Sequence, residues 1–331
     1  MHELENKCAN LLHFMKQNDN YLVTAHLGAD GDAYGAALAI AYFLEQSGKK
    51  YEIVFHDQKL DEKYEFLWGW QRIKSYDSNM TQKYDAAIVV DVPSRARIGD
   101  PAKLLPDAPF CLKIDHHPIE DHFTDFSFVD TKASSTCQLI YEIISRSSAT
   151  MDATMADLLL SGIMYDTGRF SFANTRTRDF EIAAHLTSLG ISSNIIAGNL
   201  FFSNTFDALK IVGYGLANMQ NHLNGQLCII YLPLEIMQQA KGEDIDELAN
   251  YSLSIRGVEV GLYVRHAASD LTKISFRSKG KVDVNKVARM FGGGGHVHAA
   301  GCRISTGPED VLPKIISEIE RQLAENSVEP K

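Results

Sequence analysis

The chain has 331 residues, of which 45% are hydrophobic and 22% are charged, as is typical of a globular enzyme and not of a disordered or fibrous chain. The formal net charge of −10 argues against a protein that tracks long nucleic acid on a basic face, so any phosphate-bearing substrate should be short. The N-terminus lacks the regions of a secretory signal, and the longest apolar stretch, 33–44, is too short to span a bilayer. We therefore expect no membrane association.

The cysteines are scattered, odd in number and never spaced as C-x-x-C. This pattern argues against both a disulfide framework and a thiolate zinc site, and it favours a reducing, cytoplasmic setting. The five cysteines are Cys8, Cys111, Cys137, Cys228 and Cys302.

Apolar strand-like runs alternate with helix-like segments through the first part of the chain. This alternation predicts an α/β domain over residues 1–189 with a doubly wound, mainly parallel sheet. The expected strands are 21–25, 51–55, 84–90 and 110–114, and the expected helices include 33–44, 152–164 and 178–189.

The composition changes after residue 189. Residues 190–222 look helical and are poor in catalytic residue types, so we expect a helical linker there. Residues 223–331 predict a smaller α+β domain. Its expected elements are strands at 227–231, 258–264 and 273–276, a helix at 284–290, a glycine run at 292–295 and a helix near 310–323.

Polar side chains gather where the apolar elements of the first domain end. The run 110–114 stops at Asp115-His116-His117, and Pro118 follows. Open α/β sheets bind their ligands at the carboxyl ends of the strands, so we expect these side chains to converge. A solvated loop with surface histidines would show the same local sequence and is the alternative. The full set is His26, Asp30, Asp32, Asp91, Asp115, His116, His117 and Asp166.

Such a cluster of carboxylates and imidazoles without thiolates suits a divalent ion such as Mn²⁺, and that many carboxylates cannot converge without a cation. Two ions about 3.5–4 Å apart would clamp a phosphate and activate a hydroxide. The resulting hypothesis gives His26 and Asp30 to one ion, gives Asp32, His116 and Asp166 to the other, and makes Asp91 the bridge. Asp115 would orient an imidazole, and His117 would contact the substrate phosphate or protonate the leaving oxygen.

The same motifs resemble those of the DHH phosphoesterases, and the resemblance extends in the expected order over nearly the whole chain. They are 26–32 (HLGADGD), Val90-Asp91, Asp115-His116-His117, Asp166-Thr167-Gly168, Ser275–Ser278 and the run Gly292–His296 continued to Ala300-Gly301. The last two look like the DHHA1 domain. The resemblance implies the same metal ligands, and Mn²⁺ as the cofactor with Mg²⁺ or Co²⁺ as substitutes.

The glycine run suggests how the second domain would hold its substrate. Consecutive glycines can expose backbone N–H groups to an anion, although a flexible turn is the alternative. Arg277 could complete the pocket or could be a surface charge. The expected substrate-binding residues are Arg277, Gly293, Gly294, Gly295 and His296.

Within the family the chain is similar to the stand-alone nanoRNase/pAp phosphatases. The resemblance implies hydrolysis of short single-stranded RNA to mononucleotides and of 3′-phosphoadenosine 5′-phosphate (pAp) to AMP, with a second copy of the chain as a further candidate partner. A cyclic di-AMP or pApA phosphodiesterase shares every motif and stays open, as does a nucleotide-binding module without catalysis. Pyrophosphatases with a different second domain, longer RecJ-type exonucleases and membrane-bound phosphodiesterases fit less well.

Overall fold

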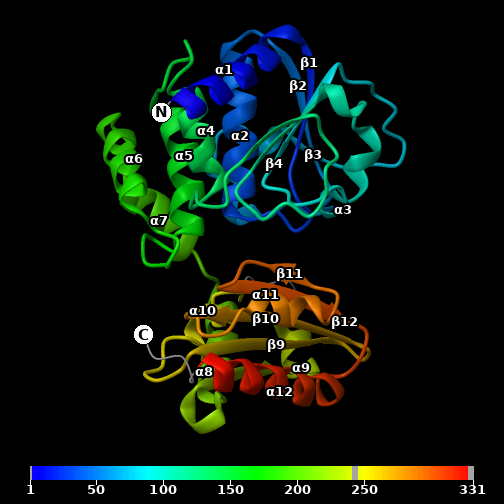
Figure 1. Cartoon of the computed structure of the whole chain (residues 1–331), viewed down its shortest axis with the longest axis vertical. Coiled ribbons are helices and arrows are strands. Elements are labelled where there is room, and N and C mark those ends of the chain that lie inside the picture. Colours follow the sequence, from blue (N-terminus) through cyan, green and yellow to red (C-terminus); the bar gives the residue numbers. More distant parts are fainter. Residues whose placement is uncertain (1, 241–244, 327–331) are drawn as a thin grey trace. The chain divides into compact units, whose positions relative to one another are not determined.

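The structure, a computed structural model, describes residues 2–240 and 245–326. The chain divides into two compact units, Met1–Ser203 and Asn204–Lys331, and the boundary falls inside the expected linker 190–222. Each unit has its own sheet and core (Figure 1).

The sheet of the first unit has six strands, and every ladder in it is parallel. The strand order β3-β2-β1-β4-β5-β6 is that of a doubly wound α/β sheet, so the predicted fold class is confirmed. The central strands are apolar throughout because both faces of a parallel sheet are covered. The strands are β1 (Asn20–Thr24), β2 (Lys50–Phe55), β3 (Ile73–Ser75), β4 (Ala86–Val90), β5 (Cys111–Asp115) and β6 (Phe126–Val129).

The two faces of this sheet are covered unevenly. The main helices and one face of the sheet form a single large core, whereas short turns and two small apolar clusters cover the other face. Between β2 and β3 the chain forms separate 3-10 turns at Glu62–Tyr64 and Trp70–Arg72. The α-helices are α1 (His2–Gln17), α2 (Gly31–Gln46), α3 (Arg95–Ile98), α4 (Thr136–Ile144), α5 (Ala153–Asp166), α6 (Thr177–Ser188) and α7 (Ser193–Phe201).

Helices α2, α4 and α5 pack closely because glycines stand at their contacts. A Cβ added at Gly35 would lie 2.7 Å from the carbonyl oxygen of Leu158, and one at Gly162 would lie 2.3 Å from Sγ of Cys137. Any side chain at either position would push the helices apart, so the glycines fix the spacing of α2 and α5.

The second unit is built on a mixed sheet in the order β11-β12-β10-β9-β8-β7, in which only β8 and β9 run parallel. This agrees with the predicted α+β class. The strands are β7 (Gln220–His222), β8 (Leu227–Leu232), β9 (Val260–Ala268), β10 (Leu271–Ser278), β11 (Gly294–Gly295) and β12 (Ala299–Ile304). The α-helices are α8 (Phe206–Ala217), α9 (Leu234–Ala240), α10 (Leu248–Tyr251), α11 (Val284–Arg289) and α12 (Pro308–Asn326).

None of the helices described in the structure is both long enough and apolar enough to cross a membrane. All five cysteines are buried and unpaired, as their scattered spacing predicted.

Candidate metal centre

Three neighbouring parallel strands deliver the first candidate ligands. His26 lies just beyond β1, Asp91 directly follows β4, and β5 ends at Asp115 with His116 and His117 behind it. Since β1, β4 and β5 are adjacent and parallel, their carboxyl ends meet at one edge of the sheet.

Asp91 lies between two imidazoles. Its Oδ2 is 3.4 Å from Nε2 of His26, and its Oδ1 is 3.5 Å from Nε2 of His116. Nε2 of His26 is also 3.8 Å from Oδ1 of Asp30, and Nε2 of His116 is 3.1 Å from Oδ2 of Asp166. The two oxygens of Asp91 thus face opposite halves of the cluster.

Three potential metal-binding groups share this aspartate, and one of them contains Asp91, Asp115 and His117. The other two carry the candidate ligands of the two halves of the cluster. One contains His26, Asp30 and Asp91, and the other contains Asp32, Asp91 and His116; within each group the potential ligand atoms lie within 4.8 Å of one another. A carboxylate common to two such groups has the arrangement required of a bridging ligand.

The backbone holds Asp91 in an uncommon conformation. Its φ is 59°, in the left-handed region that non-glycine residues rarely adopt. The backbone N–H of Asp91 donates to Ile114 at the end of β5 at 2.9 Å, and the Thr136 hydroxyl donates to its Oδ1, also at 2.9 Å. Strained backbone held in this way is common at functional sites.

Asp32 lies at the start of α2 with its carboxylate against the first turn of α4. The backbone N–H groups of Thr136 and Cys137 donate to its two oxygens at 2.6 and 2.9 Å. Burial, followed by repulsion from Asp91 and Asp166, nevertheless raises the pKa of Asp32 well above its ordinary value.

The cluster holds more negative charge than its own histidines comfortably balance. Burial raises the pKa of Asp166 to about 6 in spite of a hydrogen bond with His116. Burial alone would lower the pKa of His26, but hydrogen bonds with Asp30 and Asp91 raise it to about 10. Buried carboxylates and imidazoles in this arrangement fit divalent cations, which supply positive charge and bind oxygen and nitrogen donors.

Asp115 and His117 form a pair that adjoins the cluster, because Nδ1 of His117 also lies 3.4 Å from Oδ1 of Asp91. Oδ1 of Asp115 is 2.9 Å from Nδ1 of His117 and accepts a hydrogen bond of 3.1 Å from the backbone N–H of the same residue. Lys113 Nζ lies 3.9 Å from the other oxygen of Asp115, and burial lowers the pKa of this lysine. The carboxylate thus fixes the orientation of the His117 ring.

The residues expected to bind substrate lie in the second unit. Arg277 on β10 pairs in register with Ala299 on β12, and the carbonyl of Ala299 accepts from the N–H of His296 at 2.6 Å, so Arg277 and His296 stand at one end of the sheet. The N–H groups of Gly292 and Gly293 donate to Arg289 and Ala288, at 3.2 and 2.9 Å, and so already have partners.

The other glycines of this run serve backbone packing. Gly294 and Gly295 pair with Gly301 and Ala300 as the short strand β11. Gly295 has a φ of +145°, and an added Cβ there would lie 2.5 Å from the carbonyl oxygen of Ala299. A pocket at this end of the sheet would therefore present the side chains of Arg277 and His296 more than an open row of glycine N–H groups.

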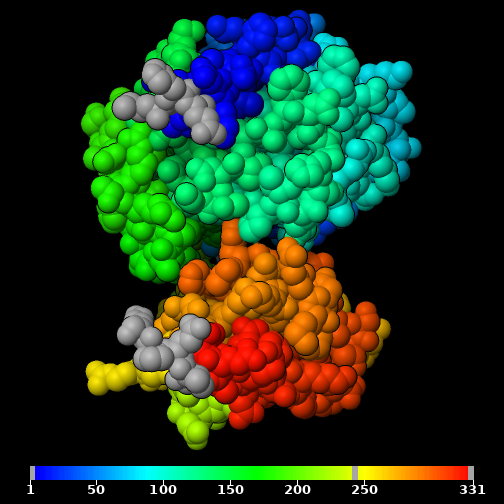
Figure 2. Space-filling model, in the orientation of Figure 1, coloured from blue at the N-terminus to red at the C-terminus, as the bar shows by residue number. Residues whose placement is uncertain are grey.

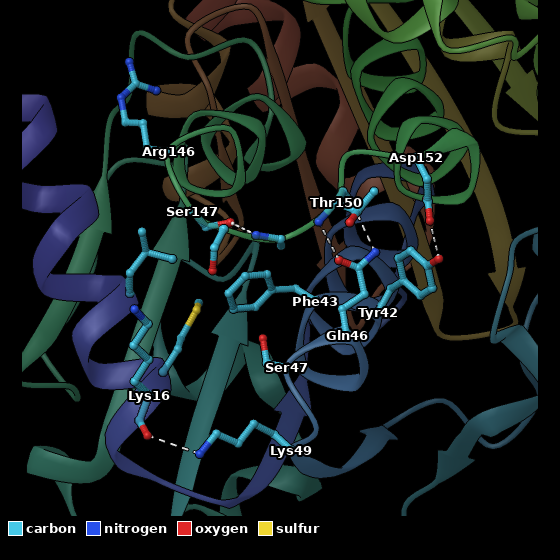
Figure 3. Close-up of a pocket in the computed structure, with 14 residues that line it drawn as sticks. Lys16, Tyr42, Phe43, Gln46, Ser47, Lys49, Arg146, Ser147, Thr150 and Asp152 are labelled. Atoms are coloured by element: carbon cyan, nitrogen blue, oxygen red, sulfur yellow. Dashed lines mark hydrogen bonds between the residues drawn. The ribbon is translucent and has the colours of Figure 1, made fainter.

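A cavity of about 690 Å³ lies at the other end of α2 from the cluster (Figure 3). The 16-residue length of α2, about 24 Å, separates the two sites. Lys49 donates to the carbonyl of Lys16 at the end of α1, and Arg146 donates to the carbonyl of Glu142 near the end of α4. Because cations are stabilising at helix C-termini, these helix ends account for the basic lining.

Residues 20–163 match the model of the DHH family N-terminal domain, and residues 224–325 match that of the DHHA1 domain. A Streptococcus mutans protein named probable bifunctional oligoribonuclease and PAP phosphatase NrnA is 30% identical over 87% of this chain and 90% of its own length. The chain belongs to the DHH family.

Further relatives of this DHH-family chain carry a similar name. The bifunctional oligoribonuclease and PAP phosphatase NrnA of Bacillus subtilis is 27% identical over 91% of this chain and 94% of its own length. The Thermus thermophilus protein of that name is 28% identical over 85% and 83%.

Solved structures share the fold. An exopolyphosphatase-related protein from Bacteroides fragilis has a TM-score of 0.88 at 23% identity, with 97% of this chain and 98% of that chain covered. RecJ from Thermus thermophilus in complex with Mn²⁺ has a TM-score of 0.55 at 13% identity, with 99% of this chain and 55% of that chain covered.

Supporting residues of the DHH-family cluster were not identified from the sequence. Thr136, the first residue of α4, contacts both Asp32 and Asp91. Asp57, beyond β2, accepts from the N–H groups of Gly28 and Ala29 at 3.0 and 3.2 Å and so holds the loop before α2. The sequence signal available for Asp57 was its position at the carboxyl end of a strand. Thr136 has no such signal, because its contacts are to residues distant in sequence.

Proposed function

We propose that this chain is a metal-dependent phosphoesterase that hydrolyses short oligoribonucleotides to mononucleotides and pAp to AMP. The observation that carries the proposal is the pair of overlapping groups joined by Asp91. The curated relatives named as oligoribonucleases and PAP phosphatases support the choice of substrates.

We assign the candidate ligands to two divalent ions, with Mn²⁺ as the expected metal because the donors are carboxylates and imidazoles only. Ions bound there would neutralise charge on phosphate oxygens and lower the pKa of a bound water. His26 and Asp30 serve one position, Asp32, His116 and Asp166 serve the other, and Asp91 serves both. The short contacts of His26 and His116 to Asp91 support this division.

His117 is assigned to the substrate. With Nδ1 held by Asp115, it is Nε2 that would contact a phosphate oxygen or donate a proton to the leaving oxygen. Burial alone would lower the pKa of His117, but hydrogen bonds with Asp115 and Asp91 raise it well above its ordinary value, which supports a protonated donor. The P–O bond to the leaving group breaks as water supplies the new oxygen.

In the second unit, Arg277, Gly293, Gly294, Gly295 and His296 are assigned to the terminal nucleotide. The positions of Arg277 and His296 at one end of the sheet support this assignment. The expected setting is the cytoplasm, because all five cysteines are free thiols.

The test is hydrolysis with Mn²⁺ of three substrate classes in parallel: a two- to five-nucleotide RNA ladder, pAp, and cyclic di-AMP with pApA. Cleavage of the short RNAs and pAp, lost in chelator and restored by metal, is the expected result. A strong preference for cyclic di-AMP or pApA would instead identify the chain as a cyclic di-AMP or pApA phosphodiesterase. If the folded, metal-loaded protein binds nucleotides but cleaves none of them, the chain is a nucleotide-binding module without catalysis.

A further inference from the structure

A row of stacked aromatic and cationic side chains begins beside the candidate metal centre, within the first unit. Tyr165 immediately precedes Asp166 on α5, and its ring stacks on Phe201 with centroids 6.4 Å apart and planes at 16°. The Arg169 guanidinium carbon lies 4.9 Å from the Phe201 ring centroid and 5.6 Å from that of Phe202. We call Tyr165, Arg169, Phe201 and Phe202 the Arg169 platform.

The outer end of this platform is open to solvent. Phe202 is 70% exposed, although it directly follows α7, whose residue Leu200 is fully buried. The segment formed by α6 and α7 lies at the surface of the first unit (Figure 2, bright green). A ring that closes a stack and faces water leaves one face available to another planar group.

The backbone beneath Arg169 is fixed in an unusual turn. Arg169 and Phe170 have φ values of 61° and 62°, both left-handed. The N–H of Arg169 donates to Met164 at 2.8 Å, and that of Phe170 donates to the Thr167 hydroxyl at 3.1 Å. Strain that the surrounding structure maintains next to Asp166 favours a functional role for the side chains it positions.

The charge on the platform distinguishes two explanations for the exposed rings. Arg169 forms no ion pair with any carboxylate in the described part of the chain. A contact between two copies of the chain would bury that unpaired guanidinium at a desolvation cost, whereas a nucleic acid brings both a base to stack on the rings and a phosphate for the cation.

We propose that the Arg169 platform stacks a nucleobase of the RNA substrate one or more nucleotides away from the phosphodiester at the metal centre, with Arg169 contacting the adjoining phosphate. The inference rests on the proposed function and adds to it a site that an oligonucleotide fills and pAp, with a single base, does not. The platform would thus favour oligonucleotides over the bisphosphate.

The test compares Phe202→Ala and Arg169→Gln with the wild type on a trinucleotide and on pAp. Base–aromatic stacking contributes about 1–3 kcal/mol per base, so the ratio of kcat/KM for the trinucleotide to kcat/KM for pAp should fall at least about 5-fold, mainly through KM. Phe110→Ala is the matched control, because Phe110 is a 48% exposed phenylalanine just before β5, at the opposite end of that strand from the cluster.

Abasic substrates make the test specific to stacking. A set of trinucleotides, each lacking one base, should contain one member on which Phe202→Ala and the wild type no longer differ, and its abasic position identifies the stacked base.

An equal fall in kcat/KM on pAp and on the trinucleotide would overturn the inference. So would a lower kcat/KM of Phe202→Ala than of the wild type on every abasic trinucleotide. So would an unchanged substrate ratio with an altered sedimentation coefficient in Phe202→Ala, which would assign the rings to a contact between copies. A wild-type protein that cleaves neither RNA nor pAp would instead refute the proposed function on which the inference rests.

Discussion

Thr136 donates its hydroxyl to Asp91 at 2.9 Å and its backbone N–H to Asp32 at 2.6 Å, so one residue in the first turn of α4 orients two of the proposed metal ligands. Removal of such a supporting hydrogen bond typically weakens metal binding about 10–100-fold. Thr136→Val keeps the shape and the N–H group but removes the donor to Asp91. We expect weaker Mn²⁺ binding by titration calorimetry within that range, and near-normal binding in Thr136→Ser. Equal affinities in wild type and Thr136→Val would show that the hydroxyl has no part in orienting Asp91.

Replacement of the shared carboxylate should have the largest effect on catalysis. Asp91→Ala removes the residue that the candidate groups share, so we expect hydrolysis to be abolished and fewer metal ions to be retained per chain. Turnover assays and elemental analysis of the purified variant test this, with circular dichroism to verify folding. Full activity in Asp91→Ala would be incompatible with the two-ion arrangement.

His296→Ala should separate substrate binding from catalysis. If the side chain holds the terminal nucleotide equally in the ground and transition states, KM rises while kcat changes less. His222→Ala is the control, because His222 lies on β7 at the opposite edge of the same sheet. A fall in kcat at constant KM would instead place His296 in the reacting machinery.

A methyl group at Gly162 should disturb the metal centre from inside the helical layer. The added Cβ would lie 2.3 Å from Sγ of Cys137 and 2.6 Å from Oδ1 of Asp32. We expect Gly162→Ala to lower the free energy of unfolding by about 1–3 kcal/mol, as overpacking does, and to weaken Mn²⁺ binding.

Gly198 on α7 provides the matched control for this substitution. A Cβ there meets no heavy atom within 4 Å, so Gly198→Ala should be neutral or stabilising by up to about 1 kcal/mol. Urea denaturation of both variants gives the comparison. If the two substitutions have equal effects, contact with Cys137 and Asp32 is not the cause.

The pair of Glu142 with Arg178 and Arg146 should give a stability contribution that disappears in acid. Burial alone would raise the pKa of Glu142, but hydrogen bonds from Arg178 and Arg146, at 2.7 and 2.6 Å, hold it below the ordinary value of 4.5. A lowered pKa in the folded state means that the carboxylate stabilises the fold above pH 4.5, and that this contribution is lost as the pH falls through the folded-state pKa.

Glu142→Gln should therefore lower the free energy of unfolding by about 1–3 kcal/mol at neutral pH. Urea titrations of both proteins should show the gap between wild type and variant narrowing below pH 4.5. A gap that is constant or widens in acid would mean that the charge on Glu142 is not what stabilises the fold.

Much of the first unit could be predicted because its signals are local. The strands leading to His26, Asp91 and Asp115 are continuous apolar runs, and parallel pairing brings their ends together without further information. The strands β3 and β6 were missed, because each is short and lies at an edge of the sheet. A short edge strand has a weak apolar pattern, and its register depends on its neighbour.

Parts of the candidate site depend on contacts that no local pattern encodes. The hydrogen bonds of Thr136 join it to Asp32 and Asp91, residues 104 and 45 positions away in the chain. The pairing of Gly294 and Gly295 with β12 likewise depends on tertiary structure, which the composition of the glycine run does not encode.

The close approach of α2 and α5 has a consequence for the spacing of the candidate metal ligands. Asp30 and Asp32 stand at the start of α2 and Asp166 at the end of α5. The distance between these two helices, which the glycine contacts set, therefore also sets the distance between the candidate ligands that they carry. A side chain at Gly35 would meet the carbonyl oxygen of Leu158, two turns before Asp166, and so would change this spacing without replacing any candidate ligand. The size of ion that fits the candidate site would then depend on this helix packing as well as on the ligand residues.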